Sequence, residues 1–171
     1  MSPQLILFGG PAGAGKSTLA WAWCNSRPRS VQIELDQVRA SIVGGYIDPG
    51  AASPEQAKQY EDSVRAACAL ARSYLSDGYD VTIDDLLYKE AYESIWLPAL
   101  GEAEASVLIL LPDLSTTLRR AGDRAKSVPD AVIVGQHHAA SRWPASQRLD
   151  TSGMTVDESI EAAVRRGLLP G

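Results

Sequence analysis

Leu5-Ile-Leu-Phe-Gly-Gly-Pro-Ala-Gly-Ala-Gly-Lys-Ser-Thr18 is a segment in which a short apolar run leads directly into a glycine-rich loop. The four apolar residues predict a buried strand. Residues 10–17 match G-x-x-x-x-G-K-[ST] at every fixed position, which is the pattern of a phosphate-binding P-loop, or Walker A motif. A purely structural glycine turn is the alternative, but the offset of Gly-Lys-Ser between strand and helix disfavours it. The motif alone specifies no reaction.

The residue types of this loop suit the binding of a polyphosphate. Its glycines let the backbone wind closely around phosphate, so that successive N–H groups point inward as an anion-binding nest. Lys16 can reach the β- and γ-phosphates, Ser17 can ligate Mg²⁺, and the helix that starts near Gly15 directs its positive dipole end at the same charge. The residues expected to contact the nucleotide here are Gly10, Pro11, Ala12, Gly13, Ala14, Gly15, Lys16, Ser17 and Thr18.

Length and composition indicate one globular domain that spans residues 1–171 and folds without disulfides. The formal net charge of −5, with 16 scattered Lys and Arg residues, disfavours a basic nucleic-acid-binding face. Cys24 and Cys68 lie far apart in predicted helices, as expected for small buried residues in a reducing compartment. The sequence shows neither a leader pattern nor an apolar run of membrane-spanning length, so we expect a cytoplasmic protein without membrane contact.

Strand and helix patterns alternate along the whole chain. Strands are expected at 5–8, 30–35, 79–83, 106–111 and 147–150. Helices are expected at 17–26, 37–43, 54–76, 89–100, 115–126, 131–141 and after 155. This alternation predicts an α/β protein with a three-layer, doubly wound parallel sheet of five strands, the P-loop NTPase fold. Residues of about 115–145 are expected to form a helical lid.

Asp36 and Arg39 form a D-x-x-R pair just after the second predicted strand. In open α/β sheets, ligands bind beyond the carboxyl ends of the strands. Asp36 could there accept a proton from an attacking hydroxyl, while Arg39 holds the acceptor or its phosphate. The alternative is a helix-capping aspartate beside a surface arginine. We favour the functional interpretation because residue type and position at the sheet edge coincide.

Asp84 and Asp85 follow the third predicted strand. An aspartate that ends a strand beside the P-loop strand can hold the magnesium ion and its water shell, or contact the acceptor. One of the pair can instead cap the following helix. We rank Asp84 first as metal ligand, and the general base remains open between Asp36 and these two residues.

Arg119, Arg120 and Arg124 lie on the predicted helix 115–126. Because Arg120 and Arg124 are four residues apart, they share a helix face and could approach phosphate oxygens when a lid closes. A solvated face balanced by nearby aspartates is the alternative. Asp150-Thr151, after the fifth strand, is expected either to bracket an adenine base or to form a simple turn.

On these residues, the whole chain resembles the P-loop small-molecule kinases with a nucleoside-monophosphate-kinase-like core. Within that group it is most similar to the zeta-toxin, polynucleotide-kinase and chloramphenicol-phosphotransferase-like set. The matching features are the P-loop, Asp36-x-x-Arg39, the arginines at 120 and 124, and Asp150-Thr151-Ser152. The resemblance implies strand order 2-3-1-4-5, ATP with Mg²⁺, Asp36 as general base, and phosphoryl transfer to a hydroxyl.

The leading hypothesis is therefore an ATP-dependent kinase whose acceptor is an antibiotic, a sugar or a nucleoside-like metabolite. A toxin that phosphorylates a cell-wall sugar nucleotide would use the same chemistry. A polynucleotide 5′-kinase is disfavoured by the acidic charge balance and by the absence of an aromatic, basic groove pattern. A nucleotide-dependent switch is disfavoured because the sequence has no Asn-Lys-x-Asp run. We expect residues 44–53 and the following helix to shape the acceptor pocket; the sequence predicts no oligomeric state.

Overall fold

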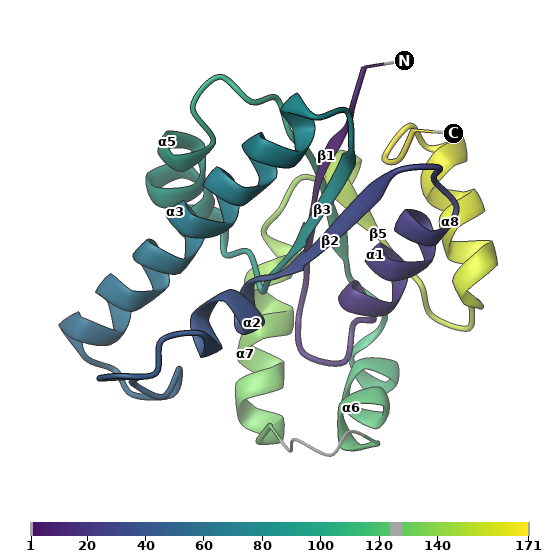
Figure 1. The fold of residues 1–171 in the computed structure, drawn as a ribbon. Helices are drawn as coiled ribbons and strands as arrows, with labels where there is room; N and C mark the ends of the chain where they lie inside the picture. Colours follow the sequence, from purple (N-terminus) through teal and green to yellow (C-terminus); the bar gives the residue numbers. More distant parts are fainter. Residues whose placement is uncertain (1, 124–127, 171) are drawn as a thin grey trace.

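The computed structural model describes residues 2–123 and 128–170, which form a five-stranded parallel sheet with helices on both faces (Figure 1). The order of the strands is β2-β3-β1-β4-β5. Their bounds are β1 Leu5–Gly9, β2 Ser30–Glu34, β3 Asp80–Asp84, β4 Ser106–Leu110 and β5 Arg148–Leu149. This confirms the predicted doubly wound fold and the strand order that the resemblance implied.

Helices α1 and α8 cover one face of the sheet, and α3 and α5 cover the other (Figure 1). The helix bounds are α1 Lys16–Asn25, α2 Leu35–Ala40, α3 Pro54–Ser76, α4 Lys89–Ala91, α5 Leu97–Leu100, α6 Leu114–Gly122, α7 Asp130–Ser141 and α8 Val156–Arg165. A π-helical turn, η1 (Tyr92–Trp96), joins α4 to α5, and a 3₁₀ turn, η2 (Ala145–Gln147), precedes β5. Within the described residues, no helix has the length and apolar character needed to cross a membrane.

The central strand β1 is buried on both sides, which accounts for its continuous apolar sequence. Its side chains alternate between two separate cores. Leu5 and Leu7 pack with residues of α3 and α5, whereas Ile6 and Phe8 pack with residues of α1 and α8. Each face of the strand therefore holds one layer of helices, and the loop that follows β1 emerges between the layers.

Two helix starts follow the capping chemistry of the sequence. The Ser53 side chain accepts a hydrogen bond of 3.1 Å from the Gln56 amide at the start of α3. Thr155 and Glu158 form both halves of a capping box at the start of α8. These contacts satisfy amide groups that a helix start leaves without intrahelical partners.

Each strand lies within one residue of its expected bounds, and at the end of β2 this shift changes the setting of Asp36. β2 ends at Glu34 and Leu35 already begins α2, so Asp36 lies in the first turn of a helix and not at the strand end. Leu35 continues the apolar alternation of β2, yet it is buried as the first helical residue. An apolar residue at position 35 fits the end of a strand and the start of a helix equally well. The apolar pattern therefore could not show where β2 ends and α2 begins.

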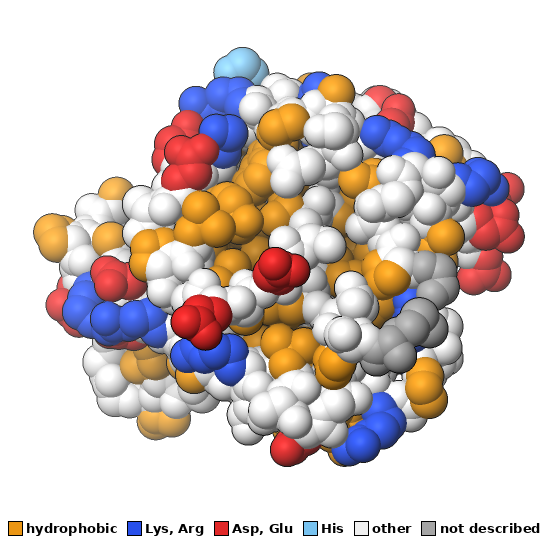
Figure 2. Space-filling model, turned by 90° about the horizontal axis from the view of Figure 1, so that it is seen from above, with side chains coloured by type: hydrophobic (Ala, Val, Ile, Leu, Met, Phe, Trp, Pro, Cys, Tyr) orange, Lys and Arg blue, Asp and Glu red, His pale blue; other side chains and the backbone are white. Residues whose placement is uncertain are grey.

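The amino edge of the sheet carries hydrophobic side chains (Figure 2) and a hollow. Figure 2 views the amino edge and shows hydrophobic side chains gathered near its centre. A hollow at this edge is lined by the N-terminal segment, by α5 and by the start of β4. The glycine-rich loop after β1 lies at the opposite, carboxyl edge, where α2, α6 and α7 also lie (Figure 1).

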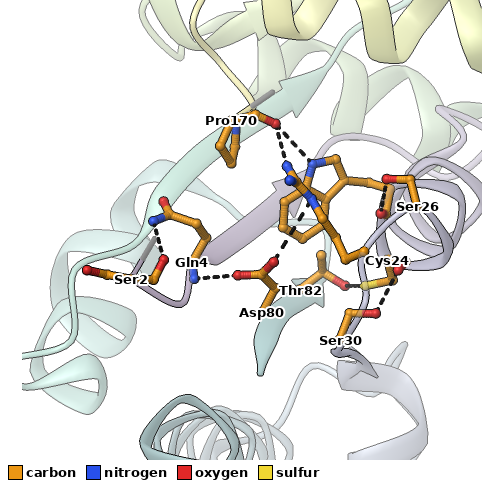
Figure 3. A network of polar contacts seen from close by, with 10 residues as sticks. Ser2, Gln4, Cys24, Ser26, Ser30, Asp80, Thr82 and Pro170 are labelled. Atoms are coloured by element: carbon orange, nitrogen blue, oxygen red, sulfur yellow. Dashed lines mark hydrogen bonds and ion pairs between the residues drawn. The ribbon is translucent and has the colours of Figure 1, made fainter. Parts of the chain in front are cut away.

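A polar network at the amino edge fastens the segment after α8 to α1 (Figure 3). The indole of Trp23 and the guanidinium of Arg27 both donate to the Pro170 carbonyl, at 3.5 and 2.6 Å. The same guanidinium lies 4.5 Å from the centre of the Trp23 ring and 4.0 Å from the Asp80 carboxylate. Asp80 in turn accepts a hydrogen bond of 2.8 Å from the Gln4 amide. One arginine thus connects three parts of the chain.

Arg27→Met should lower the free energy of unfolding by about 1–2 kcal/mol, because it removes a hydrogen bond and a cation–π contact while keeping an apolar side chain. Urea unfolding followed by circular dichroism measures the change. Arg165→Met is the matched control: Arg165 pairs with Glu161 on an exposed surface, so less than about 0.5 kcal/mol should be lost. Equal losses in the two variants would contradict the anchoring role.

Candidate active site

The glycine-rich loop between β1 and α1 is held in shape by close backbone packing. Gly10 and Gly13 adopt φ angles of 134° and 85°, which favour glycine. A Cβ atom on Gly10 would lie 2.3 Å from the Leu110 carbonyl oxygen, and one on Gly13 would lie 2.4 Å from the Thr117 carbonyl oxygen. Gly15, with φ of 96°, has no neighbouring atom within 4 Å of such a Cβ. Packing against β4 and α6 therefore requires two of the glycines, while the third faces open space.

The crest of this loop is held by two side chains. The Lys16 ammonium donates a hydrogen bond of 3.0 Å to the Pro11 carbonyl. The Ala12 amide donates one of 2.9 Å to the side-chain oxygen of Gln136 in α7. The loop thus has a lysine folded over it and leads directly into the N-terminal end of α1, an arrangement that can bind an anion.

Ser17 and Asp84 bring a hydroxyl and a carboxylate together at the foot of the loop. The Ser17 hydroxyl donates to Asp84 at 2.7 Å, and the Gln32 amide donates to Asp84 at 3.3 Å and to the Ser17 carbonyl at 3.0 Å. Burial raises the pKa of Asp84, and the bonds from Ser17 and Gln32 oppose this shift. The pair supplies hard oxygen ligands of the kind that Mg²⁺ prefers when nucleotide phosphates complete its coordination.

Asp85 points to the other face of the sheet, toward α3. Its carboxylate accepts hydrogen bonds from the Tyr60 hydroxyl at 2.7 Å and from the Leu87 amide at 3.4 Å. The Trp96 indole donates to the Tyr60 oxygen at 3.1 Å. Burial raises the pKa of Asp85, and the Tyr60 bond is the largest opposing effect. The carboxylate is engaged in this network, and a contact between Asp85 and an acceptor stays a prediction.

Asp36 and Arg39 occupy the same short helix but differ in exposure. The Asp36 side chain is exposed and, within the described residues, accepts no hydrogen bond. Its charge nevertheless contributes to the raised pKa of Asp84, so the two carboxylates share this edge of the sheet. Arg39 is only 5% exposed and donates a long bond of 3.5 Å to the Ile47 carbonyl, while its Nε atom is buried without a partner in the described residues.

The loop that follows α2 is fastened to α3 by a buried glutamine. The Gln59 side-chain oxygen accepts from the Ile47 amide at 3.0 Å, and its nitrogen donates to the Gly45 carbonyl at 2.7 Å. One side chain thereby bonds to the backbone at residue 45 and at residue 47. This loop and the first turns of α3 form the side of the site where we expected the acceptor pocket.

A pocket of about 320 Å³ lies beside the loop, between α1, α6 and the start of α8. Arg120 lines it and donates to the Thr151 carbonyl and hydroxyl at 3.3 and 3.5 Å. Asp150 accepts from the Ser152 amide at 2.8 Å, which shapes the turn before α8. The expected lid arginine Arg124 lies outside the described residues. The pocket brings Thr18, Arg120 and Thr151 together at one side of the glycine loop.

No local sequence pattern predicted that several further residues contact the site. Gln32, Tyr60 and Gln136 contact it from elements far along the chain; Gln136 is 124 residues away from Ala12. Met154 and Val156 line the pocket from the turn before α8 and from its first residue. Their contacts depend on how the elements pack, which residue spacing does not reveal.

A family model described as AAA domain matches residues 5–142. No curated protein matches the chain. The matched part contains the glycine loop, α2, the β3 carboxylates and nearly all of the expected lid. The predicted resemblance is thus confirmed at the level of the family.

Solved structures share the fold over nearly the whole chain. The tunicamycin resistance protein of Deinococcus radiodurans has a TM-score of 0.70 and 16% identity, with 98% of this chain and 97% of that chain covered. A sugar kinase from a Janibacter species has a TM-score of 0.69 and 14% identity, with 99% of each chain covered. A gluconokinase from Sinorhizobium meliloti has a TM-score of 0.62 and 15% identity, with 96% and 91% covered. At identities this low, the structural similarity shows a common fold and nothing further.

Tyr60→Phe should destabilise the protein in a pH-dependent way. Removing the hydroxyl takes away the bond that opposes the raised pKa of Asp85, so this pKa rises further. A carboxyl with a raised folded pKa costs stability as the pH rises from the ordinary carboxyl range through the folded value. The loss should therefore be smallest near pH 4 and reach about 1–3 kcal/mol at pH 8.

Urea unfolding at the two pH values measures this difference. Tyr74→Phe is the matched control, since Tyr74 lies on the same helix and its ring packs on Tyr79 at the amino edge. A loss in Tyr60→Phe that is the same at pH 4 and pH 8 would show that Asp85 does not depend on this hydroxyl.

Proposed function

Because the chain belongs to the AAA domain family, we propose that it is an ATP-dependent phosphotransferase that moves the γ-phosphate of Mg-ATP to a hydroxyl of a small molecule. The observation that carries the proposal is the contact of 2.7 Å between the Ser17 hydroxyl and Asp84, directly beside the lysine of the glycine loop. An exposed carboxylate, Asp36, lies at the same edge of the sheet. Phosphoryl transfer needs this combination of a phosphate cradle, a metal site and a group that orients the attacking hydroxyl.

The phosphate chain is proposed to lie on the loop of residues 10–18. Backbone N–H groups bind the phosphate oxygens, and the Lys16 ammonium neutralises charge on the β- and γ-phosphates. Ser17 and Asp84 hold Mg²⁺, which supplies charge neutralisation on the phosphate oxygens when it is bound. The packing of Gly10 and Gly13 against β4 and α6 supports this role, since it fixes the cradle before the nucleotide arrives.

The nucleoside is proposed to occupy the pocket beside the loop. Leu19, Met154 and Val156 give this pocket apolar walls against which a base can pack. Asp150 and Thr151 form the turn that brackets the base, and Arg120 lies between this turn and the glycine loop. From there Arg120 contributes positive charge toward the phosphates, together with Arg124 when the lid closes.

Asp36 is the proposed general base. Of the three candidate carboxylates, Asp84 is engaged by Ser17 and Gln32, and Asp85 is engaged by Tyr60. Asp36 is exposed and accepts no hydrogen bond within the described part of the chain, so its carboxylate is available to an acceptor hydroxyl. Arg39, one turn further along α2, is proposed to contact the acceptor.

The proposed acceptor is an antibiotic, a sugar or a nucleoside-like metabolite. The loop of residues 44–53 and the start of α3 form the wall beside Asp36, and Gln59 keeps this wall in place. The similar solved structures include a sugar kinase, a gluconokinase and a tunicamycin resistance protein, which supports a small hydroxylated acceptor.

Mg-ATP should give ADP only when a suitable acceptor is present. The experiment measures ADP formation with aminoglycosides, phenicols, sugars, nucleosides and 5′-hydroxyl oligonucleotides, each corrected for an acceptor-free reaction. Stimulation by one class of small molecule is expected, and Lys16→Ala should abolish it. Equal ADP formation without any acceptor would favour a nucleotide-hydrolysing switch, and stimulation by oligonucleotides alone would favour a polynucleotide 5′-kinase.

Asp36→Asn should lower kcat by about 10²–10⁴-fold, because the amide cannot accept the hydroxyl proton. ATP affinity, measured by calorimetry, should stay at the wild-type value. Asp77→Asn is the matched control, since Asp77 is an exposed carboxylate at the C-terminal end of α3. Wild-type turnover in Asp36→Asn would exclude Asp36 as the base and leave Asp84 and Asp85 as candidates.

A further inference from the structure

The peptide unit between Pro11 and Ala12 is held from both sides. Its carbonyl oxygen accepts the Lys16 ammonium at 3.0 Å, and its N–H group donates to the Gln136 side chain at 2.9 Å. The carbonyl and N–H of one trans peptide unit point in opposite directions. Lys16 and Gln136 therefore lie at opposite edges of one peptide plane, and the orientation of that plane determines where the lysine finds its acceptor.

The carbonyl edge of this peptide unit is also held by a turn, because the Ala14 amide donates a backbone hydrogen bond of 3.1 Å to the Pro11 carbonyl. Gly10 and Gly13 flank it, and proline fixes its own φ while leaving ψ to vary. Rotation of the plane would turn the Pro11 carbonyl away from Lys16. Among the described residues, the Gln136 side chain provides the hydrogen bond to the N–H edge of this unit, whereas Lys16 and the Ala14 amide bond to its carbonyl edge.

Helix α7 supplies a rigid support for Gln136. Ile133, one turn before it, is 1% exposed, and Trp143, after the helix, is buried and donates to the Leu87 carbonyl at 3.0 Å. The neighbouring His137 contacts the Pro112 carbonyl at 2.8 Å. Figure 1 shows α7 beside the loop that joins β1 to α1. A side chain on such an anchored helix can hold a backbone group in one place.

We propose that Gln136 is a positioning residue of the phosphate site: it fixes the Pro11–Ala12 peptide, whose carbonyl in turn places the Lys16 ammonium for the β- and γ-phosphates. This inference rests on the proposed binding of Mg-ATP by the loop. The role of Gln136 differs from that of the lid arginines. Gln136 supplies no charge and acts by holding the backbone that places Lys16.

The test compares ATP with AMP in Gln136→Met, which keeps the length of the side chain and removes its amide. ATP should bind about tenfold more weakly, because the lost bond between Gln136 and the Ala12 amide leaves the Lys16 ammonium less well placed for the charged phosphates. AMP has no β- or γ-phosphate, so its affinity should not change. Calorimetry measures ATP binding, and an NMR titration measures the weaker binding of AMP.

His138→Ala is the matched control, because His138 is exposed on the same helix two residues further along. It should bind both nucleotides like the wild type, and thermal melting should differ by less than about 4 °C between all three proteins. Unchanged ATP affinity in Gln136→Met, or an equal loss for ATP and AMP, would overturn the positioning role alone. A wild-type protein that binds no ATP would overturn the proposed function and, with it, this role.

Discussion

The close approach of the glycine loop to β4 and α6 is the constraint on which the candidate active site depends. Gly10 lies against the Leu110 carbonyl and Gly13 against the Thr117 carbonyl, with no room for a Cβ atom at either place. The loop is therefore shaped by its neighbours as much as by its own sequence. Because β4 must lie beside β1 for this contact to exist, the strand order of the sheet is a precondition of the proposed phosphate cradle.

Strand periodicity explains why two adjacent aspartates have different surroundings. Side chains on β3 alternate between the faces: Val81 and Ile83 pack toward α3, and Thr82 contacts Cys24 of α1. Asp84 continues the alternation on the α1 face, where it meets Ser17, whereas the next residue turns toward Tyr60 on α3. A shift of one residue in this register would exchange the two carboxylates and remove the contact with the P-loop serine.

The sequence predicted those parts of the molecule that local patterns determine. The apolar runs located the strands of the sheet, and the helical pattern located the bounds of α3. The glycine-lysine-serine pattern located the loop. The start of α2 was placed too late, because Leu35 fits either a strand or a helix. Tyr60 and Gln136 could not be predicted, since each meets its partner through packing between elements distant in the chain.

The two sides of the candidate site are held by different means, and this difference bears on specificity. The proposed phosphate side is fixed by backbone packing against β4 and α6, where Gly10 and Gly13 leave no room for a Cβ atom. The proposed acceptor side is a loop outside the sheet, to which Gln59 makes two bonds and Gln56 and Arg39 make one long bond each. The side chains that hold this loop lie on α2 and α3 and not on the glycine loop. In the proposed function, acceptor choice can therefore vary independently of the residues proposed to bind the nucleotide.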